Sequence, residues 1–130
     1  MSHPPLVPNP RYALIVDDDP AILDVYEMAL SDLGFVPVLA SNGAKALEEA
    51  EKLSPAVVIV DQRMPGITGF ELVAKIRARG APECPVIMVT ASHAYKAAAL
   101  SAGISTFLEK PFDIDDLIRA VHETTSHVAA

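Results

Sequence analysis

The sequence predicts one α/β domain, a doubly wound three-layer sandwich in which helices cover both faces of a five-stranded parallel sheet. Continuous β-branched runs recur at 13–16, 57–60 and 86–89, as is typical of strands buried on both faces. Segments with helical spacing of apolar residues lie between these runs, and such an alternation favours parallel strands joined by right-handed crossovers. The 130 residues are 51% apolar, which is enough for one core and too little for two.

The first half of the domain follows this scheme. After the run at 13–16, Asp19 and Pro20 have the residue types of an N-cap and first helical position. Gly34 stands where this helix should end. The weaker runs at 35–39 and 106–108 predict edge or shorter strands. The apolar stripe that we expect this helix to bury consists of Ile22, Val25, Ala29 and Leu33.

The second half repeats the pattern. Thr68 with Glu71 three residues later forms a capping box, and this helix should end at Gly80. The alanine-rich stretch 94–102 lacks a wide apolar stripe, so we expect it to pack loosely before the short strand 106–108. The last helix follows an N-cap at Asp113, and its stripe consists of Ile114, Leu117, Ile118 and Val121.

Composition excludes several classes of protein. With 17 acidic and 10 basic residues the net charge is -7, so bulk electrostatic binding of nucleic acid is not expected. Cys84 is the only cysteine, which excludes an internal disulfide. No apolar run is long enough to span a membrane, and the first residues lack the apolar segment of a signal peptide. We expect a cytoplasmic protein with a proline-rich flexible tail at 1–10, one domain at 11–127 and a C-terminal tail at 128–130.

Polar side chains follow the predicted strands. Because the carboxyl ends of parallel strands meet at one edge of the sheet, these side chains should converge. Converging carboxylates repel one another, and Mg²⁺ would offset that charge. A lysine can hold a phosphoryl oxygen, and a carboxylate can form an aspartyl phosphate. The residues concerned are Asp17, Asp18, Asp61, Thr90 and Lys110.

Four motifs carry a resemblance to a known family. VDDD, VDQRMPGITG, VTAS and FLEKPF occur in this order at the predicted strand ends, and together they resemble the receiver domain of bacterial response regulators over Arg11 to His127. The resemblance implies a flavodoxin-like (βα)5 fold. It also implies that Asp61 is phosphorylated, that Asp18 binds Mg²⁺ directly with Asp17 nearby through water, and that Arg63 offers its backbone carbonyl to the metal.

The resemblance also implies a switch. Lys110, before a cis Pro111, would contact the phosphoryl group, and Thr90 would hydrogen-bond it and shift toward it. Phe107 would turn inward with Thr90, changing the partner preference of the face formed by the fourth helix, the strand 106–108 and the last helix. The interval from Thr90 to Lys110 is short for this family, which places a shortening between Ser92 and Ala102, on that output face.

The implied protein is a signalling switch in a two-component system rather than an enzyme, since it catalyses only its own phosphorylation and dephosphorylation. The phosphodonor would be a sensor histidine kinase or a phosphotransfer protein. The sequence does not identify the downstream effector, and it leaves a homodimer open.

Two alternatives remain. The chain could be a receiver-like interaction module that works without phosphorylation, which the shortened segment favours. Asp17 and Asp19 also resemble the acid pair of haloacid-dehalogenase-type phosphatases, but Ala21 departs from that motif, no second acid pair follows a later strand, and Asp61 stays unexplained.

Overall fold

The computed structural model describes residues 10–79, 84–91, 96–104 and 106–126. The predicted tails therefore lie outside the described residues, apart from Pro10, as do Gly80 and Ser92. The boundaries predicted for the tails stay predictions.

A five-stranded parallel sheet forms the centre of the molecule. Its strands are β1 (Tyr12–Val16), β2 (Val36–Ala40), β3 (Val57–Asp61), β6 (Val86–Thr90) and β7 (Thr106–Glu109), in the order β2-β1-β3-β6-β7. All four pairings are parallel. The two weaker runs of the sequence form the two edge strands, as predicted, and the strongest β-branched runs form the buried centre.

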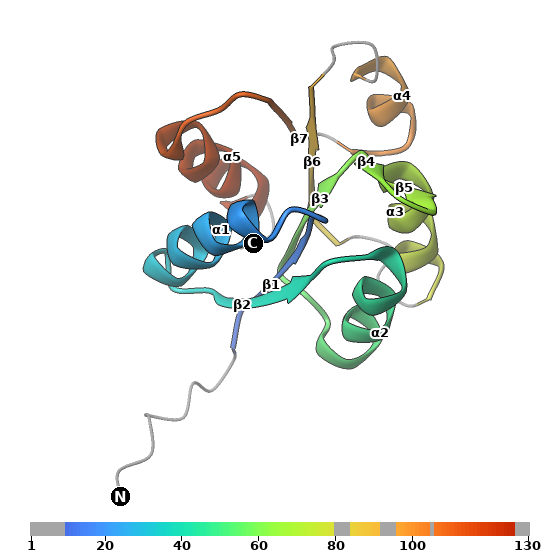
Figure 1. Ribbon diagram of the computed structural model, residues 1–130, viewed down its shortest axis with the longest axis horizontal. Coiled ribbons are helices and arrows are strands. Elements are labelled where there is room, and N and C mark those ends of the chain that lie inside the picture. The colour runs from blue at the N-terminus through green and yellow to red at the C-terminus, as the bar shows by residue number, and fades with distance from the viewer. Residues whose placement is uncertain (1–9, 80–83, 92–95, 105, 127–130) are drawn as a thin grey trace, which may run out of the picture.

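Helices cover both faces of this sheet, which confirms the predicted class. α1 (Pro20–Asp32) and α5 (Ile114–Ser126) pack on one face, and α2 (Gly43–Leu53) and α3 (Gly69–Ala78) pack on the other (Figure 1). Alternate residues of each central strand enter the two cores, so that Ile15 and Ile59 join the α1/α5 core while Leu14 and Val58 join the α2/α3 core. Within the described part of the chain, none of these helices has the length and apolar character needed to cross a membrane.

Local capping starts the helices where the sequence predicts. The Asp19 carboxylate accepts a hydrogen bond from the N–H of Ala21 at 3.0 Å, and the reciprocal bonds of Thr68 and Glu71 complete the capping box of α3. Asp113 likewise accepts from the N–H of Asp116 at 2.9 Å. Each cap satisfies an N–H that has no partner within its helix.

The predicted stripe of α1 holds in part, because Ala29 is buried and Ile22 and Leu33 pack partly buried against the α1/α5 core. Val25 is 46% exposed, and the buried side chains of this helix are Leu23, Tyr26, Ala29 and Leu30. The buried face therefore overlaps the predicted one and leaves Val25 outside it. In α5 the prediction holds better, because Leu117 and Val121 are buried, although Ile114 is 44% exposed.

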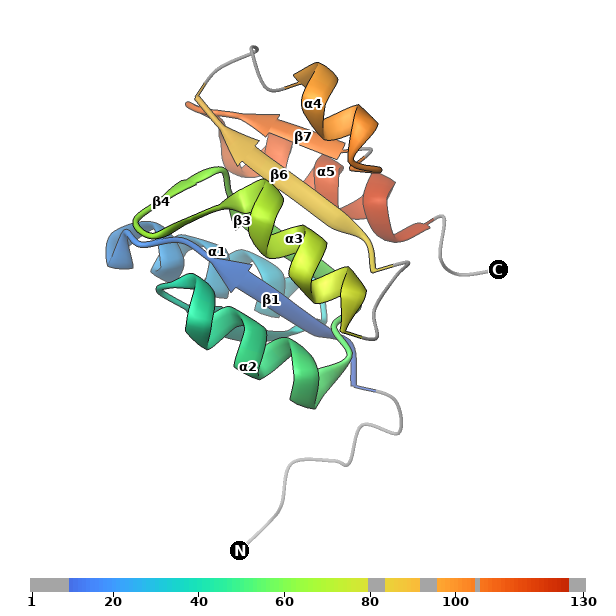
Figure 2. The same cartoon turned by 90° about the vertical axis from the view of Figure 1, so that its right-hand side faces the viewer.

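A small antiparallel hairpin between β3 and α3 was not predicted as strands. It consists of β4 (Arg63–Met64) and β5 (Ile67–Thr68), and it lies at the end of the sheet to which the strand arrows point (Figure 2). Gly66 has φ +85° and allows the tight turn. A Cβ on Gly43 would clash with the side chain of Ile67, so the hairpin packs closely against the start of α2.

The fourth helix is short, α4 (Lys96–Ser101), and Ala97 and Ala98 on it are exposed. Arg77 of α3 donates hydrogen bonds to the carbonyl oxygens of Ala102 at 2.8 Å and Gly103 at 3.2 Å. These bonds satisfy main-chain groups just after the helix and favour its carboxyl-terminal end electrostatically. The short helix is thus tied to α3 at the end that leads into β7.

Truncation of Leu72 tests the α2/α3 core. Leu72 is fully buried, so Leu72→Ala leaves a cavity and should lower the free energy of unfolding by about 2–5 kcal/mol. Met28 is 69% exposed on α1, and Met28→Ala should change it by less than about 0.5 kcal/mol. Urea unfolding of both variants measures the difference, and equal losses would contradict the described burial.

Candidate functional site

The sheet brings four predicted site residues to its carboxyl-terminal edge. Asp17 follows β1, Asp61 ends β3, Thr90 ends β6 and Lys110 follows β7. Because β3 lies between β1 and β6, Asp61 stands at the centre of this edge. Main-chain bonds continue past the strands: the N–H of Asp17 donates to Ala40 at 3.2 Å, and that of Lys110 donates to Thr90 at 2.8 Å. The backbone on both sides of Asp61 is thereby fixed.

Three carboxylates converge there. One oxygen from each of Asp17, Asp18 and Asp61 lies within 4.8 Å of the others. Asp17 and Asp61 are buried and Asp18 is exposed. Oδ1 of Asp17 accepts from the N–H of Asp19 at 2.9 Å, whereas the buried Oδ2 has no hydrogen-bond partner among the described residues. An all-oxygen cluster with one buried, unsatisfied oxygen has the chemistry of a site for a hard cation such as Mg²⁺.

Lys110 supplies the positive charge of the cluster. Its Nζ lies 3.0 Å from Oδ2 of Asp61 and 3.8 Å from Oδ2 of Asp17. Burial alone would lower the pKa of the amine, but the hydrogen bond and charge of Asp61 outweigh it, so the pKa is raised. The peptide bond between Lys110 and Pro111 is cis, as the resemblance implied.

Burial also changes the pKa of one acid of the cluster, Asp17. It raises the pKa of Asp17 above the ordinary value of 3.8; the N–H of Asp19 opposes this rise, and the charge of Asp61 adds to it. One lysine therefore faces more negative charge than it neutralises.

Arg63 begins the hairpin two residues after Asp61, and the metal contact expected of its carbonyl stays a prediction. Its N–H donates to Oδ1 of Asp61 at 3.1 Å, and the residue is exposed. The side chain thus points to solvent while the main chain lies beside Asp61. Sequence reasoning missed the residue between them, Gln62, which is only 4% exposed. Its polar side chain in a turn-forming motif gave no signal of burial.

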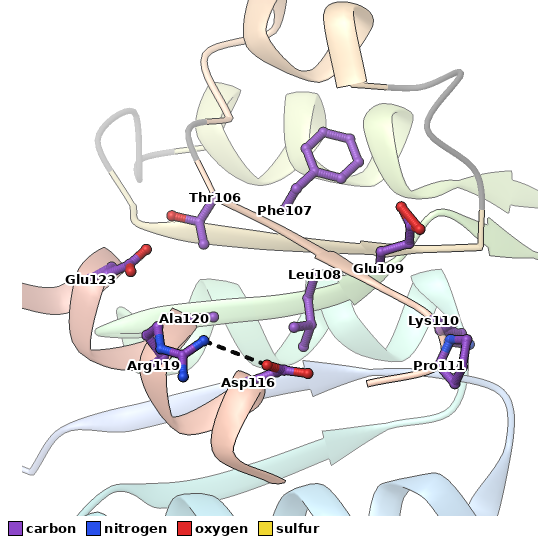
Figure 3. A pocket seen from close by; sticks show the side chains of 10 residues that line it. All are labelled: Thr106, Phe107, Leu108, Glu109, Lys110, Pro111, Asp116, Arg119, Ala120 and Glu123. Carbon is purple, nitrogen blue, oxygen red and sulfur yellow. Dashed lines mark ion pairs between the residues drawn. The ribbon is translucent and has the colours of Figure 1, made fainter. Parts of the chain in front are cut away.

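Thr90 and Phe107 lie on neighbouring strands. Thr90 is buried, and β7 pairs with β6 beside it. Phe107 is half-buried and packs against the α2/α3 core, so its side chain points away from Leu108, which faces α5 (Figure 3). A cleft of about 450 Å³ lies between β7 and α5, where Arg119 pairs with Asp116 at 3.5 Å.

Tyr26 is a second residue that the sequence did not reveal. Its hydroxyl is buried without a hydrogen-bond partner among the described residues. Burial raises its pKa, and the charges of Asp17 and Asp61 raise it further. Its ring stacks on Phe112 at 6.0 Å between centroids. Tyr26 also lines a mostly apolar hollow of about 540 Å³ that extends to Lys110.

Comparison with protein families gives one match. The model described as the response regulator receiver domain matches residues 13–122, which include all seven predicted site residues. Among curated proteins, the DNA-binding transcriptional regulator NtrC of Escherichia coli K12 is 41% identical, over 87% of this chain and 24% of the relative. An uncharacterised 14.6 kDa protein of Leptolyngbya boryana is 36% identical, over 85% of this chain and 86% of the relative. The chain thus spans about a quarter of NtrC.

Solved structures of receiver proteins are similar to this chain in fold. The chemotaxis protein CheY4 of Vibrio cholerae superposes with a TM-score of 0.83 at 30% identity, covering 88% of this chain and 98% of that one. The receiver domain of a sensor histidine kinase of Pseudomonas aeruginosa has a TM-score of 0.80 at 28% identity, covering 90% of this chain and 98% of that one. That structure has a magnesium ion coordinated in its active-site cleft.

Neutralising Asp17 should stabilise the protein in the absence of metal. The raised pKa of Asp17 means that its charged form is less favourable in the folded state than in the unfolded state. This penalty is present above the raised pKa and absent below about pH 3.8, where both states bind the proton. In EDTA at pH 7, Asp17→Asn should therefore raise Tm by a few degrees, and the gain should vanish as the pH falls toward 3.8.

The matched control is Asp24→Asn, which makes the same charge change on an exposed residue of α1. It should give a smaller rise in Tm at pH 7. Thermal unfolding followed by circular dichroism compares the two. A lower Tm for Asp17→Asn at pH 7 would contradict the described burial of the carboxylate.

Proposed function

The chain belongs to the response regulator receiver domains, the signalling switches of two-component systems, and we propose that it accepts a phosphoryl group on Asp61. One observation carries the proposal: the Lys110 ammonium lies 3.0 Å from the Asp61 carboxylate within a cluster of three acids. This arrangement presents a carboxylate nucleophile beside a fixed positive charge, at an edge of the sheet that incoming groups can reach.

The reaction would transfer the phosphoryl group from a phosphohistidine. A carboxylate oxygen of Asp61 attacks phosphorus, a P–O bond forms, and the P–N bond to the imidazole breaks. The imidazole nitrogen leaves with the electron pair of that bond and takes a proton. Such transfers depend on positioning and charge stabilisation more than on covalent chemistry. Lys110 would stabilise the phosphoryl oxygens, and Thr90 would offer its hydroxyl to one of them.

The acid cluster fits Mg²⁺. Asp17, Asp18, Asp61 and the backbone carbonyl of Arg63 would hold it, and its charge would offset the repulsion between the acids and the incoming phosphoryl oxygens. Oδ2 of Asp17, which has no hydrogen-bond partner within the described ranges, supports this assignment, as does the magnesium ion in the similar Pseudomonas receiver.

The donor would be a sensor histidine kinase or a phosphotransfer protein, the partners of receiver domains. It must bring its phosphohistidine to Asp61, and the apolar hollow ends at Lys110 beside that residue. Ile22, Val25 and Pro111 line this hollow. We therefore propose that the donor protein binds in this hollow with the part of its surface that surrounds its phosphohistidine.

Output would occur on the other side of the site. Phosphorylation would draw Thr90 toward the phosphoryl group and let Phe107 turn inward, which would change the surface of α4, β7 and α5. A bias of a few kcal/mol between two conformations is enough to change partner binding. A receiver-like module that works without phosphorylation is the second candidate, and the short α4 (Lys96–Ser101) is the feature in its favour.

Intact mass after incubation with acetyl phosphate tests the proposal. With Mg²⁺ the parent should gain one phosphoryl group, and without Mg²⁺ or in Asp61→Asn it should gain none. If the parent gains none, beryllofluoride serves as a stable mimic of the phosphoryl group. If the parent neither gains a phosphoryl group nor binds beryllofluoride, it is the module that works without phosphorylation.

Mg²⁺ should stabilise the folded protein. At a concentration about 100 times its Kd, binding raises the free energy of unfolding by about 2.7 kcal/mol. Asp18→Asn should lose this gain, whereas Asp115→Asn, an exposed acid of α5, should keep it. Urea unfolding with and without Mg²⁺ measures the effect, and an equal gain in both variants would refute the metal assignment.

A further inference from the structure

Gln62, next to Asp61, is a buried polar residue to which the proposed chemistry gives no role. It is 4% exposed, although glutamine is mostly found at protein surfaces. Burying an amide is unfavourable unless it is hydrogen-bonded, so the contacts of this residue show what its burial achieves.

Gln62 joins the central strand to the start of α3. Its N–H donates to the carbonyl of Val89 in β6 at 2.9 Å, and its carbonyl accepts from the N–H of Gly69 at 3.0 Å. Its side-chain Oε1 accepts from the N–H of Phe70 at 3.1 Å. One residue therefore fixes the backbone to β6 on one side and holds two N–H groups of the first turn of α3 on the other.

The close approach at Gly69 supports this arrangement. A Cβ on Gly69 would lie 2.8 Å from the carbonyl oxygen of Asp61 and 3.0 Å from Oε1 of Gln62. Only glycine lets the start of α3 lie this near the phosphoacceptor strand. The two chain segments are thus in direct contact on either side of the hairpin.

The chain from Gln62 to Phe70 therefore forms a loop that the hydrogen bonds of Gln62 to Gly69 and Phe70 close. The hairpin of β4 (Arg63–Met64) and β5 (Ile67–Thr68) lies between Gln62 and Gly69, so the contacts of Gln62 close its base. The N–H of Arg63, the first residue of the hairpin, bonds to Oδ1 of Asp61. The position of the Arg63 backbone relative to Asp61 therefore depends on how firmly this base is closed.

We propose that Gln62 is a positioning residue for the cation site: its buried side-chain amide holds the Arg63 backbone beside Asp61 in the geometry that binds Mg²⁺. The inference rests on the proposed function, because that function places Mg²⁺ on the Arg63 carbonyl. Replacing a residue that holds a metal ligand in position without touching the metal typically lowers metal affinity about 10–100-fold.

The test compares Mg²⁺ affinity, measured by isothermal titration calorimetry, in variants of this side chain. Gln62→Met keeps a side chain of similar length but places a methyl group where the amide oxygen lay, with a weakly accepting sulfur one bond nearer the backbone. Gln62→Leu removes the acceptor altogether. Both should raise the Kd for Mg²⁺ by about 10-fold or more. Gln62→Glu keeps an oxygen acceptor for the N–H of Phe70, so its affinity should not fall below that of the parent.

Asn42→Ala is the control for the loss of a helix cap, because it removes the N-cap of α2 and lies outside the hairpin that Gln62 closes. It should lower Tm while leaving the Kd for Mg²⁺ within about twofold of the parent. If the role of Gln62 were purely structural, Gln62→Met would likewise lower Tm and leave the Kd for Mg²⁺ within about twofold of the parent. If Gln62→Met and Gln62→Leu bind Mg²⁺ as the parent does, or if neither folds, the proposal is overturned.

The parent protein separates this failure from failure of the proposed function. If the parent itself does not bind Mg²⁺ in the titration, the metal assignment falls, and the inference on Gln62 falls with it. If the parent binds Mg²⁺ and accepts phosphate while Gln62→Met binds with equal affinity, only the inference on Gln62 is wrong.

Discussion

The ion pair between Lys110 and Asp61 is the interaction on which the carboxyl-terminal edge of the sheet depends. At 3.0 Å it offsets part of the charge of three carboxylates, but Lys110 lies farther from Asp17, at 3.8 Å. Burial already makes the charged form of Asp17 unfavourable. The site therefore holds uncompensated negative charge, and such charge is tolerated where function needs it and the rest of the fold supplies stability. A cation held by these acids, as proposed above, would offset this charge.

The fold supplies that stability through the alternation of its central strands. β1 (Tyr12–Val16), β3 (Val57–Asp61) and β6 (Val86–Thr90) direct successive side chains into two separate cores, so their interiors are apolar on both faces. Polar groups can then stand only where the strands end. Because the strands are parallel, those ends lie at one edge. The same arrangement that builds both cores thus forces Asp17, Asp61 and Thr90 together.

The sequence predicted the parts of the molecule that follow from local rules. Continuous β-branched runs identified the central strands, and capping residues identified the starts of α1 and α3. The exposure of Val25 on α1 was not predicted, because this helix carries further apolar residues at helical spacing, and only packing against the sheet decides which of them are buried. The β4–β5 hairpin and Gln62 were missed for a related reason: their main-chain contacts join residues that no periodic pattern connects.

The exposure of Val25 on α1 agrees with the proposed docking of the phosphodonor at this helix. With Leu23, Tyr26 and Leu30 in the core, Val25 remains 46% exposed. Ile22 is only partly buried against that core. Val25 and Ile22 line the hollow that extends to Lys110, together with the ring of Phe112, which stacks on Tyr26. Exposed apolar side chains beside a charged site are typical of a surface that another protein covers. On the proposed function, α1 packs one side against the core and offers Val25, at the rim of the hollow, to the phosphodonor.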